Sequence, residues 1–216
     1  MNENLIKTDQ DFEGKTKLKN FYEKNKVKII LTLLTLIILI VSFTTYLEIK
    51  KNKRISLSER YIEAKVYLED KDTNKAENIL KNIIFENDST YSSLSLFLIL
   101  NENLIEDKNE IIKLFNHILE NCKFDKEIEN LIIYKKALFE TSFVDESKLL
   151  VSLNPLLNSD SLWKPHALML LGDYYFSKKQ NIKAKEFYLE VMKLKNLNQE
   201  LYNKTRNQLV SVGNNN

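Results

Sequence analysis

The stretch that decides the fold lies near the end of the chain, at Leu170–Tyr188, and reads LLGDYYFSKKQNIKAKEFY. Its apolar residues recur at the three- and four-residue steps of an amphipathic helix, and the polar run Ser177–Asn181 interrupts them. Gly172 and Ala184 stand on either side of that break, and two antiparallel helices approach closely only where small side chains face each other. The stretch therefore predicts two helices that pack together across a short turn.

The same spacing occurs much earlier in the chain. Ala64 is followed by Tyr67 after three residues and by Ala76 after twelve, as Gly172 is followed by Tyr175 and Ala184. This spacing resembles that of tetratricopeptide repeats. In these repeats a leucine–glycine pair precedes one aromatic residue, and an alanine precedes a second aromatic residue. The residues expected to carry the repeat packing are Ala64, Tyr67, Ala76, Leu171, Gly172, Tyr175, Ala184 and Tyr188.

Polar breaks divide the chain after Glu48 into segments with the length of ordinary globular helices. Eight of these helices are expected to form four hairpins, which open near Ser56, Thr90, Asp125 and Ser161, with a ninth helix over Asn198–Val212. The two middle hairpins keep the helical period but almost none of the signature, and Lys179 stands where the repeat consensus has the turn glycine. With 3 glycines and 2 prolines in the chain, folds that need many tight turns are disfavoured. The prediction is an all-α fold, a tetratricopeptide-like helical-hairpin solenoid of about four hairpins plus a C-terminal capping helix.

A run of 19 uncharged residues, Ile29–Leu47, has about the length that a helix needs to cross a bilayer. A cleaved signal peptide is the rival interpretation, but a 28-residue polar leader is long for one and no small-residue cleavage pattern follows the run. A second rival interpretation is a helix buried inside a soluble protein. The expected organisation is a leader at 1–28, a transmembrane helix at 29–47, a basic juxtamembrane linker at 48–55, a repeat domain at 56–212 and a disordered tail at 213–216.

The distribution of charged residues does not predict the orientation of the span, and it disfavours binding to nucleic acid. Six basic residues flank the span on each side, so the positive-inside rule gives no direction. The leader holds 7 of the 32 basic and 5 of the 30 acidic residues, which leaves 25 of each after the span and disfavours binding to a phosphate backbone. The basic cluster just after the span, at Lys50, Lys51, Lys53 and Arg54, is expected to contact membrane lipid headgroups.

Residues that could support catalysis are scattered. The two histidines, His117 and His166, are 49 positions apart and have no Cys/His cluster near them. The single Cys122 has no histidine presented as a base, and there is no glycine-rich phosphate loop and no G-x-S-x-G motif. We therefore expect no enzyme activity, no catalytic residue, no metal, no cofactor and no small-molecule substrate.

Taken in order, several stretches resemble the ancillary SecYEG translocon subunit family (YfgM-like). They are the pre-anchor stretch LKNFYEKN, the span, the first repeat, the YSSL and DKNE motifs at Tyr91–Leu94 and Asp107–Glu110, and Leu170–Tyr188. The resemblance implies a single-pass protein of the bacterial inner membrane with a cytoplasmic N-terminus and a periplasmic C-terminal domain. It also implies two partners, the SecYEG translocon and a membrane-anchored parvulin-like periplasmic chaperone.

The remaining class of function is protein binding. A stack of helical hairpins has a concave surface lined mainly by the first helix of each pair, and such surfaces receive peptides or partner helices. The positions expected on that surface are Tyr61, Lys65 and Leu68 in the first hairpin and Met169, Asp173 and Phe176 in the last, with Leu68 and Phe176 equally explained as core. The expected function is a membrane-tethered interaction module at the translocon, and the alternative is an envelope-assembly or cell-division scaffold.

Overall fold

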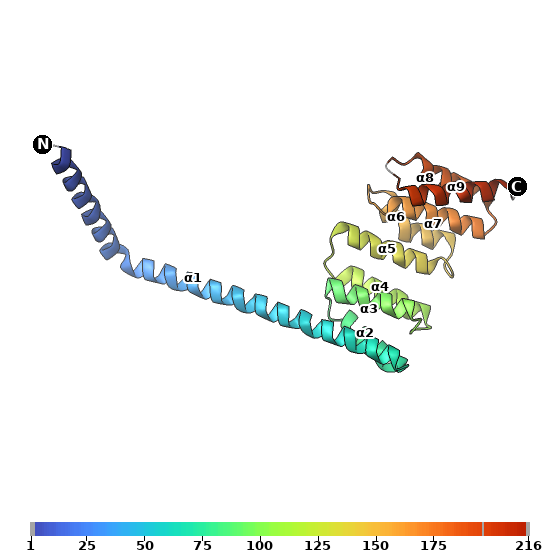
Figure 1. Cartoon of the computed structure of the whole chain (residues 1–216), viewed down its shortest axis with the longest axis horizontal. Coiled ribbons are helices and arrows are strands. Elements are labelled where there is room, and N and C mark those ends of the chain that lie inside the picture. Colours follow the sequence, from blue (N-terminus) through green and yellow to red (C-terminus); the bar gives the residue numbers. More distant parts are fainter. Residues whose placement is uncertain (1–2, 196, 215–216) are drawn as a thin grey trace. The chain divides into compact units, whose positions relative to one another are not determined.

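The computed structural model describes residues 3–195 and 197–214, and every regular element within those residues is an α-helix. The prediction of an all-α fold is therefore confirmed. The helices are α1 (Glu3–Glu69), α2 (Thr73–Ile84), α3 (Ser89–Asn101), α4 (Lys108–Asn121), α5 (Lys126–Glu140), α6 (Glu146–Leu157), α7 (Lys164–Ser177), α8 (Asn181–Lys193) and α9 (Gln199–Asn214) (Figure 1).

The chain divides into two units, Met1–Ser56 and Leu57–Asn216. In the first unit, α1 supplies the one helix among the described residues that is long and apolar enough to cross a membrane. Its apolar side chains between Ile29 and Leu47 are exposed. The hydroxyls of four threonines donate to carbonyl oxygens of the same helix at 2.7 to 2.9 Å, so they need no partner outside it: Thr32, Thr35, Thr44 and Thr45.

Helix α1 is continuous across every boundary that the sequence suggested within it. The expected ends of the leader, the span and the linker, at residues 28, 47 and 55, all lie inside the helix. No glycine or proline occurs between Lys15 and Glu69, so no residue in this range breaks the helix. The expectation of a disordered tail at 213–216 is corrected in part, because Gly213 and Asn214 belong to α9, while residues 215–216 lie outside the described residues.

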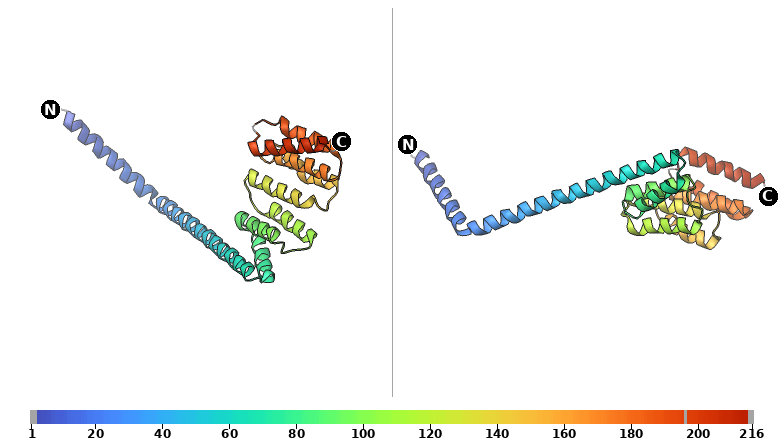
Figure 2. Two further views of the ribbon diagram at one scale, coloured as in Figure 1. Left: turned by 45° about the vertical axis from the view of Figure 1, so that its right-hand side comes forward. Right: turned by 90° about the horizontal axis from the view of Figure 1, so that it is seen from below.

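In the second unit, each helix from α2 to α9 packs against the next, and successive helices run antiparallel (Figures 1 and 2). Two apolar clusters form the core. The first joins Ala64 of α1 to Leu80 of α2 and continues through α3 and α4 to Ile132 of α5. The second begins at Ala137 of α5 and reaches Val212 of α9. The core therefore extends along the whole unit.

Three of the junctions between helices share one turn. Lys71, Asn103 and Lys179 have positive φ angles of 63°, 51° and 59°. The N–H of the following residue donates to the carbonyl oxygen five residues back in each case, at 2.8 to 3.0 Å, which defines a Schellman motif. The junction between α5 and α6 has no positive φ angle in its described residues 141–145. Lys179 thus adopts the conformation for which the repeat consensus has glycine.

The second helix of each of three pairs begins at an aspartate cap. Asp72, Asp107 and Asp145 each accept a hydrogen bond from a backbone N–H of the first turn, at 2.8 to 3.2 Å. The fourth residue after each cap is buried, and these residues are Ala76, Ile111 and Leu149. The cap therefore sets which face of each second helix enters the core.

The two helices of the last pair approach each other closely at Gly172. A Cβ atom added to Gly172 would lie 2.3 Å from Cε1 of Tyr188, so only glycine fits there. Tyr188 is fully buried, and its hydroxyl donates to Oδ1 of Asp173 at 2.8 Å. Of the eight residues expected to carry the repeat packing, seven are buried and Tyr67 is partly buried.

Candidate binding groove

Because three pairs share this turn, equivalent positions in their first helices can be found by counting back from the left-handed residue. The positions expected to meet a partner lie ten, six and three residues before the left-handed residue in both α1 and α7. We call these the contact positions. In α3 the contact positions before Asn103 are Ser93, Phe97 and Leu100.

A groove of about 690 Å³ lies at the contact positions of α3. Phe97 and Leu100 line it from α3, and Leu138 and Phe139 line it from α5. Ile105, in the connection between α3 and α4, also contributes to its apolar lining. Sites that hold ligands in proteins typically have volumes of about 300–1,000 Å³, so the groove has room for several side chains of a partner.

The connection between α3 and α4 forms one wall of the groove. At its start, Asn103 has a left-handed backbone and the N–H of Leu104 donates to the Ile99 carbonyl oxygen at 3.0 Å. At its end, Asp107 caps α4 by accepting the N–H of Asn109 at 2.8 Å. Hydrogen bonds therefore fix the wall at both ends.

Charged side chains stand at the rim of the groove. Lys108 and Lys135 line it with Glu106, whereas α3 carries no charged residue between Ser89 and Asn101. The ammonium of Lys108 lies 4.9 Å from the ring centroid of Phe143. Within the part of the chain that the structure describes, neither lysine pairs with a carboxylate. The groove thus combines an apolar floor with a net positive rim.

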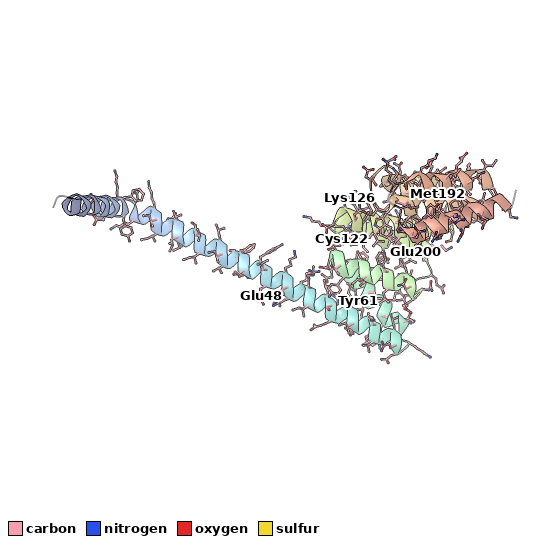
Figure 3. All side chains as sticks on the ribbon, turned by 45° about the horizontal axis from the view of Figure 1, so that its top comes forward. Glu48, Tyr61, Cys122, Lys126, Met192 and Glu200 are labelled. Atoms are coloured by element: carbon pink, nitrogen blue, oxygen red, sulfur yellow. The ribbon has the colours of Figure 1, made fainter. Side chains whose placement is uncertain are left out.

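The sequence-predicted residues of the first pair lie on α1, and none of them lines this groove. Tyr61 is partly buried, and its ring centroid is 6.2 Å from that of Tyr91 (Figure 3). Partial burial raises the pKa of the Tyr61 hydroxyl. Lys65 is exposed, and Leu68 is partly buried. Lys65 is therefore the most accessible of the three.

The residues predicted in the last pair are covered by α9. Met169 is only 3% exposed, and the hydroxyl of Thr205 lies 3.4 Å from its sulfur atom. Asp173 accepts a hydrogen bond from Gln208 at 3.3 Å in addition to the one from Tyr188. The expectation that Met169 is open to a partner is corrected, because α9 packs on the same face of α7. Phe176 is partly buried and packs against the same cluster.

None of the residues that line the groove was among the sequence-predicted positions, and the floor comes from three of them: Phe97, Leu100 and Leu138. Two of them carried a usable signal, because asparagine tolerates a left-handed backbone, and aligning Asn103 with Lys179 gives Phe97 and Leu100 directly. Leu138 carried none, since the pair α5–α6 has no left-handed residue from which to count. It lies 40% exposed on α5.

The surroundings of Cys122 do not activate its thiol. It is buried at the C-terminal end of α4, close in sequence to Lys126 at the start of α5 (Figure 3). Burial raises the pKa of its thiol, which keeps the sulfur protonated and weakly nucleophilic. Among the described residues, no group of three or more His, Cys, Asp or Glu could hold a metal ion.

A second cavity of about 560 Å³ lies at the start of α7. Trp163 and His166 line it, and the Trp163 ring stacks on Tyr134 with 5.4 Å between centroids. Burial lowers the pKa of His166, and the charge of Lys204 lowers it further. The rings mainly pack on one another, so this cavity is less suited to a partner than the groove on α3.

Comparisons with known proteins do not identify a relative. No family model matches the chain, and no match was found among curated proteins or solved structures. The function must therefore be argued from the groove and the apolar helix.

Proposed function

We propose that the protein is a membrane-anchored module for protein–protein interaction, whose second unit is a tetratricopeptide-like solenoid of four hairpins closed by α9. The observation that carries the proposal is the groove of about 690 Å³ with an apolar floor from α3 and α5. An exposed apolar surface of this kind in a folded protein is typical of an interaction site.

A protein partner suits the groove better than a small reactive substrate. The ionisable groups around it are Lys108, Lys135 and Glu106, and they stand at the rim of an apolar floor. A nucleophile with an adjacent base is the usual requirement for covalent catalysis, and the residues lining the groove offer no such pair within the described chain. Apolar side chains flanked by charges are what this lining can bind.

The proposed location is the bacterial inner membrane, with the N-terminus in the cytoplasm and the second unit in the periplasm. The proposed partners are the SecYEG translocon and a membrane-anchored parvulin-like chaperone, which the module would help to receive exported or inserted proteins. Support comes from the family resemblance and from the apolar part of α1. An anchor raises the effective concentration of the module near other membrane proteins, so weak contacts become occupied.

Photo-crosslinking tests the partners. A photoreactive amino acid at Lys65 or Lys135 is expected to capture a translocon subunit or the chaperone in cells. The matched control is Lys185, which is exposed on α8. Equal capture from Lys185 would contradict a special role for the first helices. Capture of division or cell-wall proteins in place of secretion components would favour the scaffold alternative.

Protease accessibility tests the location. We expect alkaline carbonate to leave the protein in the membrane pellet, because the uncharged run of α1 is embedded in lipid. Protease added to intact spheroplasts is expected to digest the second unit and spare the leader. Digestion of the second unit only after lysis would reverse the topology and remove the periplasmic partners.

A further inference from the structure

We infer that the second unit associates end to end with a second copy of this chain, through the exposed faces of α1 and α9. The inference goes beyond the proposed function, because neither of these helices lines the groove on α3 and α5. It is drawn from the exposed apolar residues at the two ends of the helical stack and from the opposite charges of those ends.

Helices α1 and α9 are the first and the last helix of the stack that forms the second unit. One apolar cluster includes Ala64 of α1, and the other reaches Val212 of α9. A stack of helical hairpins buries apolar side chains between neighbouring helices, so the outer faces of its end helices are usually polar. Both end helices of this unit carry exposed apolar residues instead.

The outer face of α1 is apolar and acidic. Ile62 and Val66 are 58% and 49% exposed. Each is two residues from the fully buried Ala64, so both lie on the side of the helix that is turned away from the core. The charged residues beside them are exposed, and three of the four are acidic: Glu59, Glu63, Lys65 and Glu69.

The outer face of α9 is apolar and basic. Tyr202 and Val210 are 40% and 57% exposed, and the exposed Arg206 lies between them. The three follow one another at steps of four residues, which keep side chains on one face of a helix. Thr205, by contrast, is fully buried and contacts Met169 of α7. The face that contains Arg206 is therefore free of the contacts that hold α9 on the stack.

The charges of these two faces belong to a larger asymmetry in the second unit. Residues 57–160, which contain the first three helix pairs, include 20 acidic and 12 basic residues. Residues 161–216 include 4 acidic and 9 basic residues. The acidic end of one copy therefore attracts the basic end of another, whereas like ends repel. This complementarity favours a second copy as the partner, with α1 of one copy against α9 of the next.

The membrane is expected to contribute to the stability of this contact. Two single helix faces bury less than the roughly 1,200–2,000 Å² of a stable protein–protein interface, so the contact is weak by itself. Anchoring in one bilayer raises the effective concentration of the copies toward each other. Because the two joined faces differ, each copy keeps a free face and further copies can add to form a row.

Disulfide trapping between two full-length variants tests the inference. The variants Ile62→Cys and Val210→Cys, each with the buried Cys122 replaced by alanine, are reconstituted together in phosphatidylcholine vesicles and oxidised with copper phenanthroline. We expect the mixture to form linked dimers at least about fivefold faster than either variant alone, because unlike faces meet. Lys185→Cys, at an exposed position of α8, replaces Val210→Cys in the control mixture and should not be trapped above background.

Charge reversal tests why the faces meet. Arg206→Glu in both trapping variants is expected to slow dimer formation in the mixture by at least about threefold, and so is the pair Glu59→Lys and Glu69→Lys. All three substitutions together should restore the rate, since the attraction returns with its sign reversed. Circular dichroism of each variant checks that the helices are intact.

Each other result overturns the inference. Faster trapping of Ile62→Cys alone would mean that like faces meet, and a slow triple variant would mean that charge does not select the partner. A photoreactive residue at Ile62 that captures another protein in cells, and no second copy, would assign the face of α1 to that protein. Trapping no faster than in the Lys185→Cys control would remove the self-association, and capture of a secretion component from Lys135 would still support the proposed function.

Discussion

The pairs α7–α8 and α3–α4 adopt the same turn with different packing. In the last pair Gly172 lies seven residues before the left-handed Lys179, and the equivalent residue before Asn103 is Leu96. Gly172 has no side chain, which leaves room for the ring of Tyr188. Leu96 is fully buried in a cluster that contains Phe115. The backbone register therefore does not depend on the small residue of the repeat signature.

The two pairs also differ in what covers them. Leu170 of α7 is 6% exposed, and its counterpart Leu94 of α3 is 41% exposed. Helix α9 covers Met169 and Asp173 on α7, while Phe97 and Leu100 on α3 border the groove and Ser93, the equivalent of Met169, is buried. Of these two pairs, the one covered by α9 keeps the signature, and the one beside the groove has departed from it.

Replacing Leu96 by alanine should cost the most stability. Leu96 is fully buried, and deletion of such a side chain typically costs about 2–5 kcal/mol through lost burial and a residual cavity. Guanidinium unfolding of Leu57–Asn216 followed by circular dichroism would measure the loss. Leu94→Ala, at the more exposed position, is the control and should change stability much less. Equal effects would mean that the register of α3 is misassigned.

Replacing Gly172 by alanine should also destabilise the unit, although alanine is the better helix former by about 1 kcal/mol. The added methyl group would overlap the buried ring of Tyr188, and overpacking typically costs about 1–3 kcal/mol. Gly213→Ala is the matched control, because a Cβ atom there meets nothing within 4 Å. Differential scanning calorimetry should show a lower Tm for the first variant only. A raised Tm for Gly172→Ala would contradict the close approach.

The stability of the last pair should also depend on acid. The hydroxyl of Tyr175 donates to Glu146 at 2.7 Å and Lys183 lies 3.1 Å away, so the Tyr175 bond, followed by the lysine, lowers the pKa of Glu146. A lowered pKa stabilises the fold above the ordinary value of 4.5, and this stabilisation is lost as pH falls through the folded value.

The variant Glu146→Gln tests that dependence. Its unfolding midpoint is expected to lie below that of the parent protein at neutral pH, and the two should converge as the pH falls below 4.5. Glu190→Gln, at an exposed position of α8, should follow the parent at every pH. A constant difference down to the lowest pH would show that the carboxylate charge is not involved.

The smallest effect is expected at the turns. A left-handed backbone costs an ordinary residue about 1–2 kcal/mol, whereas glycine adopts it freely but loses more entropy on folding. Lys179→Gly should therefore stabilise the unit by up to about 1 kcal/mol. Asn103→Gly should stabilise the unit by less, since asparagine already tolerates a left-handed backbone. Urea midpoints of both variants give the comparison, and a larger gain at Asn103 would contradict it.

Much of the fold could be predicted from the sequence because its signals are local. The apolar period and the polar breaks gave the positions of α2 to α9, and the uncharged run gave the apolar part of α1. Small residues at fixed spacing identified Gly172 and Ala184 as buried positions. The candidate site was harder to predict from the sequence. Phe97 and Leu138 are far apart in sequence, and only the packing of α3 beside α5 brings them to one groove.

The sequence by itself determined the helical class, the helix positions and the helix that is apolar enough to span a membrane, because periodicity, turn residues and hydropathy act within a few residues of each other. Tertiary structure alone decided which surfaces stay open. It buried Met169 beneath α9, although its helical position gave no sign of this, and it left Leu94 and the floor of the groove accessible. The physical reason is that exposure depends on which helix packs against a face, and that choice is made between residues distant in sequence.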